Sequence, residues 1–101
     1  MTGPSAGGWS PRPPDDEDAV RVAALVLAHL NNTSAARHAM GVMISASHQV
    51  VAGSNYRVRF TIDPDTDTRV VDATVWEQPW LDRTEITELT VAAARAGELP
   101  D

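Results

Sequence analysis

One stretch of the sequence, residues 15–30, has helical periodicity, and most of the chain after it has the pattern of strands. Two prolines and a run of carboxylates mark the start of this helix, and residues 31–34 supply the polar, loop-forming side chains that end it. Its apolar residues recur at intervals of three and four and so share one face: Ala19, Val22, Ala23, Val26 and Leu30. The strands that follow are the only candidate to cover this face. The sequence therefore predicts an α+β domain in which a sheet wraps one helix of about four turns.

The first predicted hairpin runs from Met40 to Ile62. Its first strand, Met40 to Val51, alternates so that one face would carry Val42, Ile44, Ala46, His48 and Val50. A Gly-containing turn at residues 52–55 follows. The second strand then places on one face Tyr56, Val58, Phe60 and Ile62.

Two further strands complete the predicted sheet. Residues 63–67, rich in Asp, form a turn, and the next strand covers about Thr68 to Glu77. Pro79 ends it because proline has no N–H to donate to a neighbouring strand. The last strand lies around Glu85 to Val91, and the Ala-rich segment Val91 to Ala96 leaves a helix as the alternative for its end. We thus predict a four- to five-stranded antiparallel sheet wrapped around one α-helix.

The length of 101 residues suits one domain. Residues 1–14 are rich in Gly, Pro and Ser, and we expect them to be a flexible N-terminal trunk. Residues 15–96 form the single predicted domain, and residues 97–101 form a C-terminal tail.

The charge distribution argues against nucleic-acid and membrane partners. The formal net charge is -6, and no Lys/Arg-rich segment offers contacts to phosphates. The acidic residues concentrate at the start of the helix and in the 63–67 turn, where they are typical of capping and turn formation. No apolar run approaches the length needed to cross a membrane. We expect a soluble, cytoplasmic protein, or a secreted one if a signal peptide has been removed.

Residues that could support catalysis or bind a cofactor are few and scattered. The absence of cysteine excludes disulfides, thiol nucleophiles and thiolate metal sites. His29, His38 and His48 lie far apart in the sequence, the serines near His48 have no clear acidic partner, and no Gly-rich phosphate loop is present. We therefore expect no enzymatic activity, no metal and no cofactor.

Three short stretches place apolar or conformationally special residues where solvent is expected: Gly7-Gly8-Trp9, Gln49 to Gly53, and Gln78 to Leu81. In a series of antiparallel hairpins, alternate turns fall at the same end of the sheet, so the 52–55 and 78–82 turns should lie together. An N-terminal strand near Trp9 that started at that end would bring all three stretches to one edge.

These stretches carry a resemblance to a known family. The sequence QVVAG at 49–53, the Pro79-Trp80 pair inside VWEQPWLD, and the double glycine at positions 7 and 8 resemble the three inhibitory motifs of the cystatins, which are reversible inhibitors of papain-like cysteine proteases. Their order and spacing fit the family, and the match runs from about Gly7 to Leu89. In its lack of cysteine, the chain is similar to stefins and to many plant cystatins.

The resemblance implies a reversible, competitive, tight-binding inhibitor of papain-like cysteine proteases. It would block the active-site cleft with its N-terminal segment and two hairpin loops. The residues that match the family motifs, and that the resemblance places against the protease, are Gly7, Gly8, Gln49, Val50, Val51, Ala52, Gly53, Pro79, Trp80 and Leu81. We assign Trp76 a structural or edge-packing role, and a core role is the alternative for Trp80.

One alternative function stays open. The residues just before Gly8 are small, Ser5, Ala6 and Gly7, so the trunk offers little apolar area. This favours a non-inhibitory protein-binding or structural module with the same fold, whereas the intact loop motifs favour inhibition. We expect a monomer, with a domain-swapped dimer as the alternative.

Overall fold

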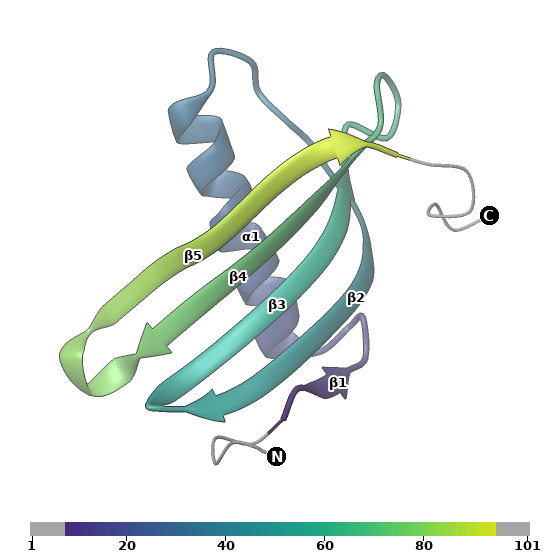
Figure 1. Ribbon diagram of the computed structural model, residues 1–101. Helices are drawn as coiled ribbons and strands as arrows, with labels where there is room; N and C mark the ends of the chain where they lie inside the picture. Colours follow the sequence, from purple (N-terminus) through teal and green to yellow (C-terminus); the bar gives the residue numbers. More distant parts are fainter. Residues whose placement is uncertain (1–7, 95–101) are drawn as a thin grey trace.

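The computed structural model describes residues 8–94. Within them the chain forms one α-helix, one short 3-10 helix and five strands (Figure 1). In chain order these elements are β1 (Ser10–Arg12), α1 (Glu17–Thr33), β2 (Met40–Val51), β3 (Gly53–Ile62), β4 (Arg69–Gln78), η1 (Pro79–Leu81) and β5 (Arg83–Ala93). The strands pair antiparallel in the order β1-β2-β3-β4-β5, which confirms the predicted fold class.

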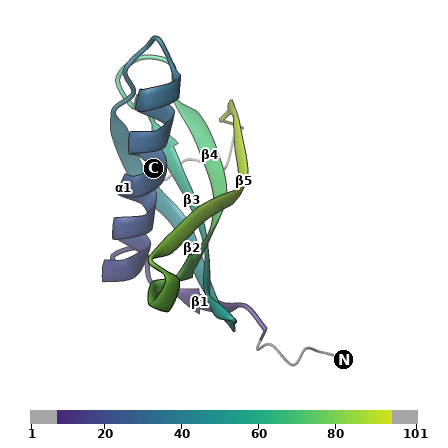
Figure 2. The same ribbon diagram turned by 90° about the vertical axis from the view of Figure 1, so that its left-hand side faces the viewer.

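Helix α1 begins where the sequence supplies a cap. The Asp16 carboxylate accepts a hydrogen bond from the backbone N–H of Ala19 at 3.0 Å and so satisfies one of the free donors of the first turn. The helix starts at Glu17, two residues after Asp15, because Asp16 occupies the capping position. It crosses the strands diagonally (Figure 1), lies on the concave side of the sheet (Figure 2) and packs against β2 and β3.

The core lies between the helix and the curved sheet. The apolar faces predicted for α1 and β3 lie there together with one face of β4, and the largest fully buried side chains are Phe60, Ile62, Val22, Val26, Val58, Val71 and Val75. Each such side chain contributes about 1.5–3 kcal/mol relative to an exposed one. The core therefore fixes the sheet on which the hairpin turns are carried.

The predicted alternation of β2 is wrong in its first half. Register shifts interrupt its pairing with β3 on both sides of Met43. As a result Met43 packs against the core beside Ala46, three positions away, whereas Val42 is 46% exposed. Each extra residue in a bulge reverses which face the following side chains occupy, so a strict period of two fails here.

Strand β5 is longer than predicted and is not helical at its end. It covers Arg83–Ala93, and Ala92 and Ala93 still pair with β4, which excludes the helical alternative for residues 91–93. Ile86 pairs with Val75 and Glu88 with Thr74, so Thr87 is the extra residue of a bulge. Residues 95–101, which include the predicted tail, lie outside the described residues.

The segment predicted as a flexible trunk contains a short strand in its described part. Ser10, Pro11 and Arg12 pair with His48, Ser47 and Ala46 at the edge of the sheet. Proline is tolerated there because an edge strand has one side without a neighbour. No helix among residues 8–94 is long and apolar enough to cross a membrane.

Candidate functional site

Both predicted loops lie at the same end of the sheet, where β2 meets β3 and β4 meets β5 (Figure 1). We call residues 49–53 the first loop and residues 78–82 the second loop. The register connects them, because Ser54 pairs with Glu77 and Glu77 pairs with Thr84. The 63–67 turn is at the opposite end, as the hairpin order predicts.

The first loop is tighter than the predicted four-residue turn at 52–55. Val50 pairs with Ser54 and Val51 with Gly53, which leaves Ala52 alone between the two strands. Gly53 has a φ of 100°, a conformation that L side chains rarely adopt. A Cβ at this position would also overlap the carbonyl oxygen of Glu77 in β4. Glycine is thus required at position 53 both by the turn and by the close approach of β4.

The side chains of the first loop present apolar surface to solvent. Val50 is 61% exposed, and Val51 is half-buried. The Gln49 side chain accepts a hydrogen bond from the Asn55 amide at 3.3 Å, which braces the two strands next to the tip. The loop therefore combines a fixed backbone with an uncovered valine.

The second loop is a short 3-10 turn. Pro79 occupies its first position, and the backbone N–H of Asp82 donates to the Pro79 carbonyl at 3.0 Å. Asp82 closes the turn in the left-handed conformation, with a φ of 49°. Trp80 and Leu81 are 64% and 58% exposed, so the alternative of a core role for Trp80 is wrong. Exposed large apolar side chains gathered at one edge are typical of an interaction site.

The N-terminal segment reaches the same end of the sheet. Ser10 pairs with His48, so Gly8 precedes β1 at the end of the sheet where the first loop lies. Gly8 is exposed, and a Cβ there would meet no atom within 4 Å. The Arg57 guanidinium lies 4.5 Å from the ring centroid of Trp9, a cation–π contact that sequence analysis missed. Gly7 lies outside the described residues.

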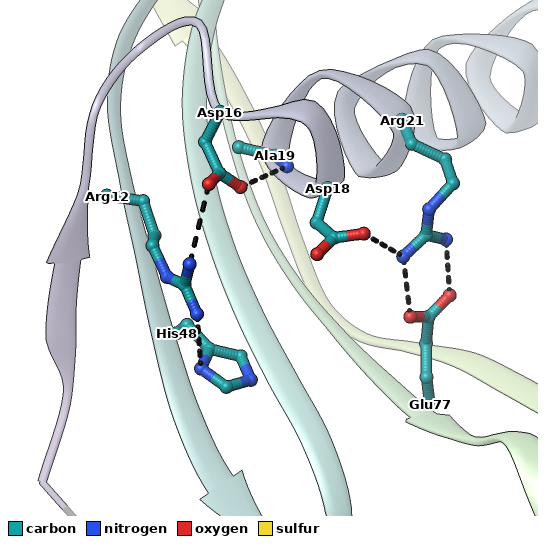
Figure 3. Close-up of polar contacts among 7 residues, drawn as sticks. All are labelled: Arg12, Asp16, Asp18, Ala19, Arg21, His48 and Glu77. Atoms are coloured by element: carbon teal, nitrogen blue, oxygen red, sulfur yellow. Dashed lines mark hydrogen bonds and ion pairs between the residues drawn. The ribbon is translucent and has the colours of Figure 1, made fainter.

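Polar contacts fix the elements behind the two loops (Figure 3). Arg12 in β1 lies 3.5 Å from the Asp16 carboxylate and donates to Nδ1 of His48 at 3.2 Å. Arg21 in α1 forms a two-point ion pair with Glu77, at 2.7 and 2.9 Å. The hydrogen bond to Glu77 raises the pKa of the Arg21 guanidinium above its ordinary value. These contacts fasten β1 and α1 to the strands that carry the loops.

Tyr56 lies between these polar groups. Its ring is 4.8 Å from that of His48, and the Arg21 guanidinium is 5.9 Å from its centroid. Burial raises the pKa of the Tyr56 hydroxyl, with the Asp18 carboxylate acting in the same direction, so the side chain is neutral at physiological pH. The aromatic ring thus adds to the core beneath the loops and carries no charge.

The histidines do not come together as a catalytic group. His29 is exposed on α1, His38 contacts Asp63 at the far end, and His48 contacts Arg12 in β1. Among residues 8–94 no group of three or more His, Asp or Glu side chains could hold a metal ion. Together the two loops instead place exposed apolar side chains, those of Val50, Trp80 and Leu81, at one end of the sheet.

Comparisons with known proteins agree with this architecture. The family model of the cystatin domain matches residues 7–93. Cysteine proteinase inhibitor 5 of Arabidopsis thaliana is 30% identical over 88 residues, which span 85% of this chain and 72% of the plant protein.

Two solved structures share the fold. Mialostatin, a gut cystatin from the hard tick Ixodes ricinus, superposes with a TM-score of 0.74 at 17% identity, over 87% of this chain and all of the tick chain. Dimeric human cystatin F gives a TM-score of 0.78 at 16% identity, over 94% of each chain.

Proposed function

The chain belongs to the cystatin family, whose members are protease inhibitors and not enzymes, and we propose that it is a reversible, competitive, tight-binding inhibitor of papain-like cysteine proteases. In this proposal the first loop, the second loop and the N-terminal segment enter the active-site cleft together. The chain acts as a monomer, one copy to each protease.

The observation that carries the proposal is the common location of the exposed apolar side chains. Val50 on the first loop and Trp80 and Leu81 on the second are each more than half exposed, and they share one end of the sheet. Burying these groups is favourable by about 25 cal/mol per Å² of apolar surface, and no element of the described chain covers them. A protease cleft is a partner of suitable shape for such an edge.

The first loop would fill the cleft without being cleaved. Its backbone is held in a tight turn because Val50 and Val51 pair with β3 on one side and Gly53 rests against β4 on the other. A substrate peptide must instead bind in an extended form with its bond positioned for attack. A backbone that is already rigid also loses little conformational entropy on binding.

The second loop would supply most of the apolar contact area. A tryptophan buries about 150–250 Å² when it is covered, and it does so with only two side-chain torsions to fix. The 3-10 turn and Pro79 hold Trp80 in place before binding. Protease–inhibitor interfaces bury about 1,600 Å² in total, so one tryptophan and two aliphatic side chains form a plausible centre for the contact.

The N-terminal segment would contribute less. Gly8 has open space around it, and the residues before it are small, so they add little apolar area. We therefore propose that the two loops carry most of the affinity.

Steady-state inhibition of papain by the purified chain tests the proposal. We expect the apparent inhibition constant to rise linearly with substrate concentration, as competition requires, and trypsin to be unaffected because its nucleophile and cleft differ. A folded sample that leaves papain fully active at micromolar concentration would contradict inhibition. That result would instead support a non-inhibitory binding module.

A further inference from the structure

Trp76 reaches from strand β4 to the tip of the first loop. It pairs with Asn55 of β3, and its indole Nε1–H donates a hydrogen bond to the carbonyl oxygen of Ala52 at 2.8 Å. Ala52 is the residue between β2 and β3 and is outside their paired register. The side chain of Trp76 therefore holds a carbonyl at the exposed tip of the hairpin.

The tip rests on β4 at a second point. Gly53 approaches the carbonyl of Glu77 so closely that no side chain fits between them. Trp76 and Glu77 are consecutive residues, and the second loop begins at Gln78. The position of the first loop is thus set by the same short segment that leads into the second loop.

We propose that Trp76 is a positioning residue that fixes the first loop relative to the second loop, an inference that rests on the proposed inhibition. Without its N–H donor, the Ala52 carbonyl would bond to water and the tip would move relative to β4. Binding would then have to order the tip, and the entropy lost in doing so weakens affinity.

Trp76 is suited to this role and not to a role in the core. Its side chain is only partly buried, and it is absent from the cluster of buried residues that packs α1 against the sheet. Removing its N–H while keeping an aromatic ring should therefore change the loop and leave the fold intact.

The variant Trp76→Phe tests the proposal, with Thr87→Val as its matched control. The Thr87 hydroxyl also donates to a carbonyl, that of Thr74 in the same strand β4, at 3.3 Å and away from both loops. Each variant thus loses one side-chain donor to a backbone carbonyl. The measurements are the papain inhibition constant and its dissociation rate, the thermal unfolding midpoint, and the hydrogen exchange of the indole N–H groups by NMR.

We expect Trp76→Phe to raise the inhibition constant about three- to tenfold, the range that one hydrogen bond supplies, mostly through faster dissociation. Thr87→Val should inhibit like the wild type, and the two unfolding midpoints should agree. In the free wild-type chain the indole N–H of Trp76 should exchange more slowly than that of exposed Trp80.

Three outcomes would overturn the proposal. Equal inhibition by Trp76→Phe and the wild type would remove the positioning role and leave inhibition itself standing. An indole N–H of Trp76 that exchanges as fast as that of Trp80 would show that the hydrogen bond does not hold the tip. A wild-type chain that fails to inhibit would overturn the proposed function and this role with it.

Discussion

Arg21 on helix α1 and Glu77 near the end of β4 form a two-point ion pair, with Nη1···Oε2 and Nη2···Oε1 distances of 2.7 and 2.9 Å. The Glu77 side chain is only 15% exposed, whereas that of Arg21 is 47% exposed. Because the second loop starts at the next residue, the pair connects the helix directly to the base of the candidate site. Its loss should affect both stability and the loop.

Replacing Arg21 with Met should lower the free energy of unfolding by about 1 kcal/mol, since it leaves a largely buried carboxylate without its main partner. In a chain of this size that corresponds to a fall of about 4–8 °C in the unfolding midpoint. The difference should shrink at about 1 M salt, where charges are screened within about 3 Å. Arg37→Met, in the exposed connection before β2, controls for the loss of one positive charge; an equal fall in both variants would contradict a specific pair.

Replacing Trp80 with Ala should weaken papain inhibition by about 30-fold or more, because truncating a central aromatic side chain in an interface typically costs at least about 2 kcal/mol. The unfolding midpoint should stay near that of the wild type, since the side chain is 64% exposed. Val42→Ala removes exposed apolar surface from β2 away from both loops and should inhibit normally. Equal inhibition constants for Trp80→Ala and Val42→Ala would place the contact elsewhere.

Replacing Gly53 with Ala should both destabilise the chain, by about 1–3 kcal/mol, and weaken inhibition. The reason is the positive φ and the overlap of any Cβ with the Glu77 carbonyl. Gly8→Ala is the matched control, because its Cβ would enter open space, and its unfolding midpoint should equal that of the wild type. Urea unfolding of the two variants would measure the contrast; a fully stable Gly53→Ala would contradict the geometry of the tip.

Replacing Asp63 with Asn should lower stability at neutral pH and have less effect in acid. A hydrogen bond from the Ala39 backbone, at 2.9 Å, and then the His38 ring lower the pKa of the Asp63 carboxyl below its ordinary value of 3.8. The carboxylate thus stabilises the fold above about pH 4, and this contribution is lost as the pH falls through the lowered pKa. Asparagine tolerates the left-handed backbone at this position, where φ is 55°.

Urea midpoints at pH 7 and at about pH 3 check the pH dependence of Asp63→Asn. The stabilisation by the carboxylate is complete at pH 7 and is partly lost at about pH 3, which lies below the ordinary pKa of 3.8. The gap to the wild type should be larger at pH 7. Asp65→Asn, in the same turn and exposed, should match the wild type at both values. A gap that does not change with pH would indicate that the charge of Asp63 is not the cause.

Residue patterns predicted the helix, four of the five strands and the fold class because most of the chain keeps one periodicity for several residues. The apolar face of α1 is buried as predicted except for Leu30, which is partly buried, and the predicted apolar face of β3 from Tyr56 to Ile62 is buried. β-Bulges in β2 and β5 limited the accuracy of the remaining predictions. Ile86 and Leu89 both pack against the core although they are three positions apart. A regular strand cannot place two such residues on one face, but the extra residue Thr87 allows it here. Because a helix gives the same spacing, the pattern did not distinguish a bulged strand from a helix.

Sequence motifs located the two loops, but not what holds them. The exposure of Trp80 and Leu81 follows from a turn that Pro79 begins, which the pattern indicated. The hydrogen bond from Trp76 to Ala52 and the pair between Arg21 and Glu77 join residues 24 and 56 positions apart. Such contacts depend on the register of several strands and on where the helix crosses them, and neither is encoded in local periodicity.

Hydrogen–deuterium exchange of the chain, alone and saturated with papain, tests most directly that one end of the sheet is the protease-binding surface. We predict slower exchange in residues 49–53 and 78–82 on binding, and no change in the 63–67 turn at the opposite end. Protection confined to the 63–67 turn, or unchanged exchange in both loops while papain is bound, would contradict the proposed protease-binding surface.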